Sequence, residues 1–170
     1  MAKKKINITL SSKSINDAIK RLQKYSDELE RKNEVFVRRL TEIGINVINM
    51  QVSAAKGDSS KAINIDNRIR PLKNYVVARI EVTGQDILFL EFGAGIHYNS
   101  GNSHPKAGEF GYGVGTYPGA THSYDDFWFY VDDNGDKHMS NGAEATMPVY
   151  RAYEAMYKQV AQIAREVFGG

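Results

Sequence analysis

The stretch SINDAIKRLQKYSDELERKNEVFVRRLTEIGINVINMQVSA, residues 14–54, organises the rest of the chain. Its apolar residues recur in steps of three and four, which predicts a helix over 14–56 with one apolar face, N-capped by Ser14. The apolar positions form two runs: Ile15, Ala18, Leu22, Tyr25 and Leu29, then Phe36, Leu40, Ile43, Val47, Met50 and Ala54. A helix this long would span ~60 Å. We therefore expect it either to break near Asn33, where the stripe lapses, or to project its first half outward.

Strand patterns follow this helix. Alternating apolar residues in Tyr75–Val82 predict a strand, and the apolar run Ile87–Phe92 after a tight turn predicts its hairpin partner. The aromatic run Asp125–Val131 predicts a third strand. Asn134-Gly135 is typical of a hairpin turn, so Asp136–Ser140 is the expected return strand.

The chain closes with a second helix, predicted over 146–168, with Thr146 as its cap and Pro148 in its first turn. Its expected buried face is Val149, Tyr153, Met156, Val160, Ile163 and Val167. The predicted fold is α+β, one domain over residues 1–170, with the C-terminal helix packed on an antiparallel sheet of about four to five strands. Residues 1–13 form an arm or edge strand, where Lys5–Leu10 alternates, and 73–140 form the sheet with a long loop at 93–122.

Composition narrows the class of protein. With 170 residues and 42% hydrophobic content, the chain can bury a core, and its lack of cysteine excludes disulfides and thiolate sites. No apolar run is long enough for a membrane span or a signal peptide, so we expect a cytoplasmic protein with no membrane partner.

Charge is unevenly distributed along the chain. Residues 1–40 hold eleven Lys/Arg against five Asp/Glu, whereas residues 81–136 hold nine acids against one base. Two solvated faces are one interpretation. The others are contact between the basic part of one copy and the acidic part of the next, or weak non-specific contact of the basic part with DNA.

Several motifs have the residue types for chemistry but lack the spacing. The four histidines, which are potential zinc or manganese ligands, do not follow a compact ligand pattern. They are His97, His104, His122 and His138. Asp132–Asp136 lacks the terminal glutamate of a calcium loop, and Gly111–Gly115 does not open a helix as a phosphate-binding loop must. Thr121–Ser123 beside Asp125 has hydrolase-type residues without a nucleophile elbow. We expect no enzyme activity, metal or cofactor.

The loop at 93–122 has the composition of a contact surface. It carries eight glycines and four large aromatic rings but only two charges. Rings left in water forgo their burial free energy, so we expect this loop to order against another chain. The candidate interface residues are Tyr98, Phe110, Tyr112, Tyr117 and His122.

Two phrases, Glu91-Phe92-Gly93 and Pro148-Val149-Tyr150-Arg151-Ala152, stand in an order that resembles a known family. Together with the N-terminal helix, the variable Gly/Pro-bearing loop and the aromatic strand, they are similar to the head–tail joining, or tail-completion, proteins of long-tailed bacteriophages and prophages. The likeness covers residues ~14–168. The chain departs from the family in its longer loop and in Ala145-Thr146-Met147, where an arginine is common.

The resemblance implies a structural virion protein at the head–tail junction, assembled in the host bacterial cytoplasm. It implies a homo-oligomeric ring, a hexamer in the family, that contacts the head-closure connector and the tail terminator or tail tube. The alternatives are another phage assembly protein, such as a tail terminator or minor capsid protein, and a metal-dependent or serine hydrolase using the histidine-rich loop. We also predict that Glu91 and Arg151 form a half-buried ion pair at the base of the loop.

Overall fold

The computed structural model describes residues 9–55, 63–73, 75–84, 86–93, 104–112, 118, 128–131, 134–140, 142 and 144–169. In chain order its elements are α1 (Ser12–Ala54), β1 (Asn64–Leu72), β2 (Tyr75–Thr83), α2 (Ile87–Phe92), the 3₁₀ turn η2 (Gly108–Phe110), β3 (Trp128–Val131), β4 (Lys137–Ser140) and α3 (Pro148–Phe168). The α+β class and the two long helices are confirmed.

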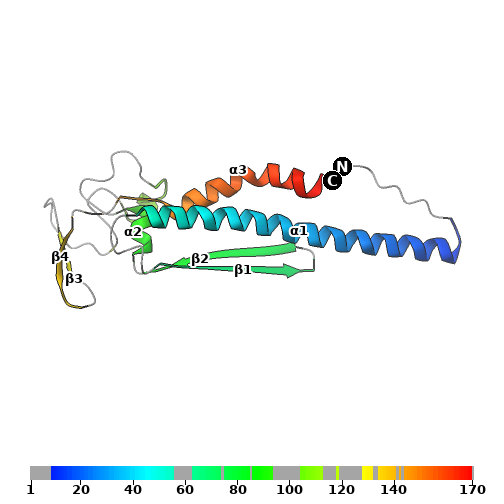
Figure 1. Ribbon diagram of the computed structural model, residues 1–170, viewed down its shortest axis with the longest axis horizontal. Helices are drawn as coiled ribbons and strands as arrows, with labels where there is room; N and C mark the ends of the chain where they lie inside the picture. Colours follow the sequence, from blue (N-terminus) through cyan, green and yellow to red (C-terminus); the bar gives the residue numbers. More distant parts are fainter. Residues whose placement is uncertain are drawn as a thin grey trace.

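Helix α1 is continuous over 43 residues, so of the two expected alternatives the break near Asn33 does not occur. Its first half instead extends beyond both α3 and the β1–β2 hairpin (Figure 1). The N-cap is Ser11, not Ser14 as predicted. The Ser11 side chain accepts a hydrogen bond from the Ser14 amide at 3.3 Å, and the Thr9 amide donates to the Ser14 hydroxyl at 3.0 Å. The first bond satisfies an amide that the first turn of a helix leaves free, and the second ties the residue before the helix to that turn.

The strands form two separate two-stranded sheets in the described ranges, not one sheet of four or five strands. Strand β2 pairs antiparallel with β1, from Asn64 opposite Thr83 to Leu72 opposite Tyr75. The predicted partner, Ile87–Phe92, is helix α2. The prediction failed because an apolar run without alternation has no period that distinguishes a strand from a buried helical turn.

The hairpin of β3 and β4 has the pairing that the sequence indicates, with Trp128 opposite Ser140 and Val131 opposite Lys137. Gly135 in the connecting turn has φ 87°, a conformation that favours glycine over other residues. Residues 125–127 of the predicted third strand lie outside the described residues. The same holds for residues 5–8 of the strand predicted at Lys5–Leu10. The hairpin lies at the opposite end of the molecule from the start of α1 (Figure 1).

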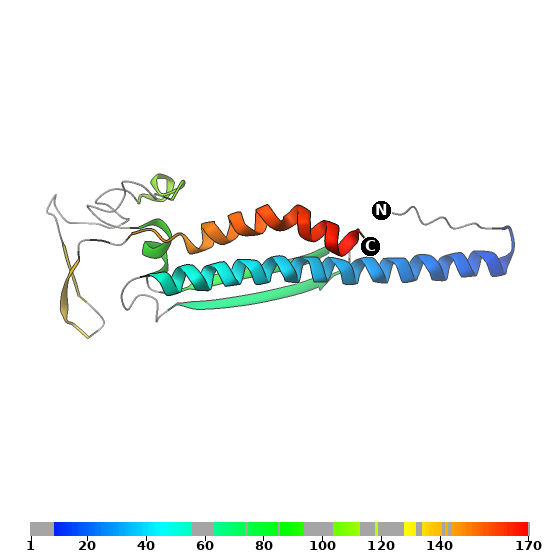
Figure 2. The same ribbon diagram turned by 45° about the horizontal axis from the view of Figure 1, so that its top comes forward.

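The core lies around the second half of α1, between the β1–β2 hairpin on one side and α3 on the other (Figures 1 and 2). Ile48 and Val52 of α1 and Ala152 of α3 are buried together, and Ile80 and Val82 of β2 pack against them. The second predicted run of α1 is not fully buried: Phe36, Leu40, Ile43 and Val47 are half-buried, and Met50 and Ala54 are exposed. The buried positions of this half of the helix are instead Thr41, Gly44, Ile48 and Val52, which face α3 and the β1–β2 hairpin. In the first run Ala18 is buried, whereas Ile15, Leu22 and Tyr25 are exposed.

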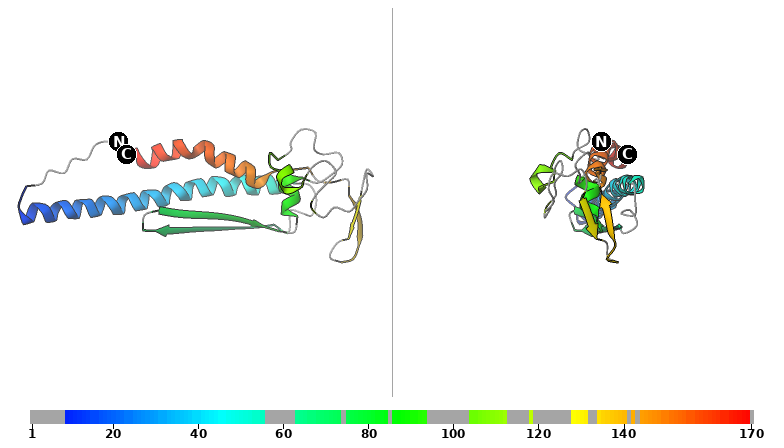
Figure 3. Two further views of the ribbon diagram at one scale, coloured as in Figure 1. Left: turned by 180° about the vertical axis from the view of Figure 1, so that it is seen from behind. Right: turned by 90° about the vertical axis from the view of Figure 1, so that its left-hand side faces the viewer.

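Helix α3 runs antiparallel to α1 and packs along it, rather than on the sheet as predicted (Figure 3). Near its end, Phe168 contacts Phe36 with ring centroids 5.7 Å apart, and Glu166 pairs with Arg39 at 2.6 Å. The predicted buried face is only partly correct. Ile163 is buried, but Val149, Tyr153 and Val160 are 40–59% exposed.

Candidate assembly surface

Glu91 holds together the two phrases on which the family resemblance rests. Glu91 lies near the end of α2 and is buried, with 7% of the residue exposed. One oxygen of its carboxylate accepts a hydrogen bond from the Val149 amide and the other from the Tyr150 amide, each at 2.8 Å. These are free amides of the first turn of α3, where the helix dipole also favours a negative charge. Glu91 is therefore the cap of a helix that begins 57 residues later.

The cap predicted from the sequence, Thr146, has a different role. Its amide and hydroxyl donate to the Leu90 carbonyl oxygen at 2.8 and 3.3 Å, and the Met147 amide donates to the same oxygen at 3.0 Å. Met147 precedes α3 in the left-handed conformation, with φ 53°, and its side chain makes no capping bond. Because no local side chain caps α3, the distant carboxylate of Glu91 provides this interaction.

Glu91 and Arg151, both described, are not paired with each other, contrary to the predicted ion pair. Arg151 donates from Nη1 to Gln51 Oε1 at 2.9 Å and so joins α3 to α1. The physical reason is that the free amides at the start of α3 already meet both carboxylate oxygens, while the next turn of the helix faces α1.

His104 completes the surroundings of Glu91. Its Nε2 lies 3.3 Å from Glu91 Oε1, and its Nδ1 accepts a hydrogen bond from the Lys106 amide at 3.0 Å. Because Nδ1 is an acceptor, a neutral ring carries its proton on Nε2, which faces the carboxylate. The ring also meets Phe92 and Tyr150 edge-on, with centroids 4.6 and 5.0 Å away. His104 is thus fully engaged in packing and hydrogen bonding.

Metal binding has no support in the described part of the chain, where no three His, Asp or Glu side chains gather as a metal site requires. His138 lies exposed on β4, far along the chain from His104. His97 and His122 lie outside the described residues.

Part of the predicted loop at 93–122 folds back on its own chain. Tyr112 is buried and stacks on Phe92, with the two ring centroids 4.9 Å apart. Burial raises the pKa of the Tyr112 hydroxyl above its ordinary value. Phe110 contacts the same ring at 5.2 Å but remains 55% exposed. Of the candidate interface residues, Phe110 is therefore accessible to a partner, whereas Tyr112 makes its contacts within its own chain. Tyr98, Tyr117 and His122 lie outside the described residues.

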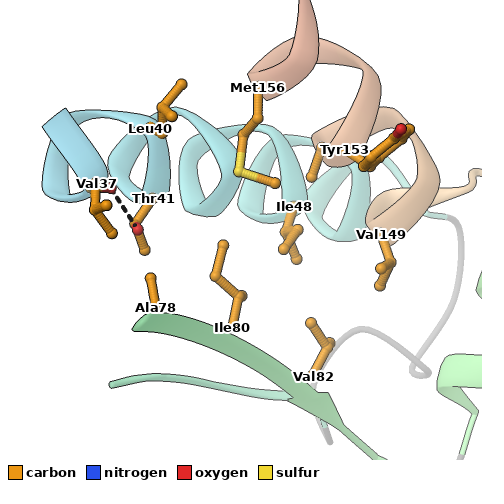
Figure 4. A pocket seen from close by; sticks show the side chains of 11 residues that line it. Val37, Leu40, Thr41, Ile48, Ala78, Ile80, Val82, Val149, Tyr153 and Met156 are labelled. Atoms are coloured by element: carbon orange, nitrogen blue, oxygen red, sulfur yellow. Dashed lines mark hydrogen bonds between the residues drawn. The ribbon is translucent and has the colours of Figure 1, made fainter. Parts of the chain in front are cut away.

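A second feature, which the sequence did not reveal, is an apolar groove of about 320 Å³ between α1, β2 and α3 (Figure 4). Met156 reaches from α3, and Ile80 from β2, toward Gly44 of α1. A side chain on Gly44 would begin 2.8 Å from Met156 Sδ and 2.9 Å from Ile80 Cδ1. The groove is lined by Val37, Leu40, Thr41, Ile48, Ala78, Ile80, Val82, Val149, Ala152, Tyr153 and Met156.

The chemistry of the groove is almost wholly hydrophobic. None of its eleven lining residues, all within the described ranges, is charged. The Thr41 hydroxyl donates to the Val37 carbonyl oxygen at 2.8 Å, so this group is already satisfied. Such a surface can bind apolar side chains but offers no group for acid–base or nucleophilic chemistry.

The third feature is the projecting half of α1. Ile15, Ile19 and Leu22 are 42, 48 and 54% exposed and follow one another in steps of four and three. We call these three residues the arm stripe. Residues at such spacing share one face of a helix, so the arm presents a continuous apolar surface to its surroundings.

None of the helices in the described ranges combines the length and apolar content required of a membrane span. Comparison of this chain with protein-family models, curated proteins and solved structures found no match in any of the three.

Proposed function

We propose that this protein is a structural component of a bacteriophage head–tail junction. It assembles as a homo-oligomeric ring, a hexamer by the family resemblance, between the head-closure connector and the tail terminator or tail tube. It has no catalytic role, and it reaches the virion after folding in the host cytoplasm.

The observation that carries this proposal is the contact between Glu91 and the start of α3. A Glu-Phe-Gly phrase and a Pro-led helix start are each common in proteins, and their co-occurrence alone is weak support. The two hydrogen bonds of 2.8 Å from Val149 and Tyr150 give both phrases one shared role. A motif with a physical reason for its two separated parts supports the resemblance better than either phrase does.

The exposed apolar surfaces also favour an assembly protein. Monomeric soluble proteins rarely leave large contiguous apolar patches in water, and such patches mark interaction sites. This chain has an uncovered arm stripe and an open groove. In addition, the basic first half of α1 lies at the opposite end of the molecule from α2 and β3, which belong to the acidic segment 81–136 (Figure 1). This polarity suits stacking between unlike rings.

The proposal is tested first by sequencing the DNA that flanks this reading frame. Portal-like and major-capsid-like frames upstream, with a tail-tube-like frame downstream, are the expected result. Deleting the frame from such a genome should then leave filled heads and finished tails unjoined in electron micrographs, and the wild-type chain supplied in trans should restore infectious particles. Metabolic neighbours, or undiminished infectious yield after deletion, would overturn the proposal.

A further inference from the structure

The arm stripe and the groove lie on the same helix, and each lacks apolar contacts that the other could provide. On α1, the stripe spans Ile15 to Leu22 and the groove floor spans Val37 to Ile48. At 1.5 Å per residue these lengths are about 10 and 16 Å. The three stripe side chains together expose on the order of 300 Å² of mostly apolar surface, which is similar in size to the largest and often functional patch of a typical monomer.

Within one molecule, the stripe cannot fill the groove. Both belong to one uninterrupted helix, and Leu22 and Val37 are separated by fifteen residues, or about 22 Å along its axis. An α-helix without a break cannot fold back on itself. The stripe can therefore reach a groove only in another copy of the chain.

We propose that the groove of one copy binds the arm stripe of a second copy. Ile15, Ile19 and Leu22 of the second copy then lie over the groove floor, between Ala78 of β2 and Tyr153 of α3. The proposal rests on the proposed function only for the idea that copies assemble into a ring; the contact itself follows from the two surfaces.

The distribution of charge supports a second copy as the occupant. Lys13, Lys20 and Lys24 lie on the side of α1 opposite the stripe, because successive helical residues are rotated by about 100°. An arm seated in the uncharged groove would thus keep its lysines in water, and no charge would be buried without a partner. A contact between two different surfaces of one protein also closes into a ring when the rotation allows it.

The test is a mixing experiment by sedimentation velocity with two variants that each damage one surface. Leu22→Glu places a charge on the stripe, and Ala78→Glu places one at the exposed wall of the groove. Each variant alone is expected to associate at least tenfold more weakly than the wild type. An equimolar mixture should recover a two-chain complex, because the Ala78→Glu chain keeps an intact stripe and the Leu22→Glu chain keeps an intact groove.

Matched controls use neighbouring exposed positions that face elsewhere. Lys24→Glu on the side of α1 opposite the stripe, and Val77→Glu on the other face of β2, introduce the same side chain and should associate as the wild type does. Helix content by circular dichroism must match the wild type for every variant. If either variant fails to fold, Ile19→Glu or Ala78→Lys takes its place.

Three outcomes would overturn the proposal. They are a wild-type chain that stays monomeric up to about 0.5 mM, a groove variant that associates like the wild type, and a mixture that recovers nothing. The second outcome would assign the stripe to a different occupant, such as another stripe. Failure here is distinguishable from failure of the proposed function. If the ring forms on its connector through surfaces other than the arm stripe and the groove, heads and tails would still join, although the mixing experiment would give a negative result.

Discussion

Replacing Glu91 by glutamine tests the structural centre of the molecule. In the wild type, the carboxylate accepts two backbone hydrogen bonds at 2.8 Å, and the residue is only 7% exposed. Glutamine keeps one acceptor oxygen, but its NH₂ group then faces a backbone N–H, so one bond is lost and one buried donor remains unsatisfied. Hydrogen bonds to charged groups contribute about 1.5–3 kcal/mol. Loss of a helix cap costs about 0.5–2 kcal/mol.

These effects overlap because the cap is the same hydrogen bond, so we expect Glu91→Gln to lower the free energy of unfolding by about 2–3 kcal/mol. In a chain of this length each kcal/mol shifts Tm by roughly 2–4 °C, which gives a decrease of roughly 5–10 °C. Glu91→Ala leaves both amides without their acceptor, and at about 1–3 kcal/mol for each unsatisfied donor it should cost about 2–6 kcal/mol.

Thermal unfolding followed by circular dichroism measures the decrease, and urea unfolding gives the free energy. Glu42→Gln is the matched control, because Glu42 is exposed on α1 and its change should stay within about 0.5 kcal/mol. A Tm of Glu91→Gln within about 1 °C of the wild type would show that the carboxylate is not the cap of α3.

Three further predictions concern other parts of the fold. Gly44→Ala should change the free energy of unfolding in urea by less than about 1 kcal/mol, because its gain in helix propensity offsets displacement of the ends of the Met156 and Ile80 side chains. Gly44→Leu should cost about 1–3 kcal/mol, and a larger loss for alanine than for leucine would contradict the packing. Burial raises the pKa of Tyr112 in the folded state, so the tyrosine of the unfolded chain ionises at lower pH. The free energy of unfolding should therefore fall above about pH 10. Tyr112→Phe should make that decrease smaller in urea titrations at alkaline pH. Ser11→Ala should lower amide protection in the first turn of α1 by hydrogen exchange while leaving the urea midpoint unchanged, since that turn lies far from the core.

The sequence predicts what depends on local periodicity and turn chemistry. The apolar steps of three and four predict two helices, and both are observed as the continuous helices α1 and α3. Asn134-Gly135 predicts a turn, and it lies between β3 and β4. It does not reveal β1, because Pro71 and the polar residues of this strand weaken the apolar–polar alternation that is typical of a strand.

What the sequence does not predict depends on contacts between distant residues. The capping of α3 by Glu91 joins positions 58 and 59 residues apart, and nothing local distinguishes that carboxylate from one that pairs with Arg151. Likewise, Val149, Tyr153 and Val160 have the spacing of a buried face, yet they are exposed. Periodicity identifies an apolar face but not whether the molecule itself has enough structure to cover that face.

Val149 connects the two surfaces on which the proposals rest. Its backbone amide is held by Glu91, and its side chain lines the groove. Loss of the Glu91 cap frees the first turn of α3, which forms one wall of the groove, so that change should weaken association as well as stability. A charge on the arm stripe removes a contact with a second copy but leaves the fold of its own chain unaltered, so it should weaken association alone. A variant of Glu91 should therefore lose both stability and association, whereas a variant of the arm stripe should lose association only. If the Glu91 variant lost stability but associated normally, the assembly surface would not depend on the cap of α3.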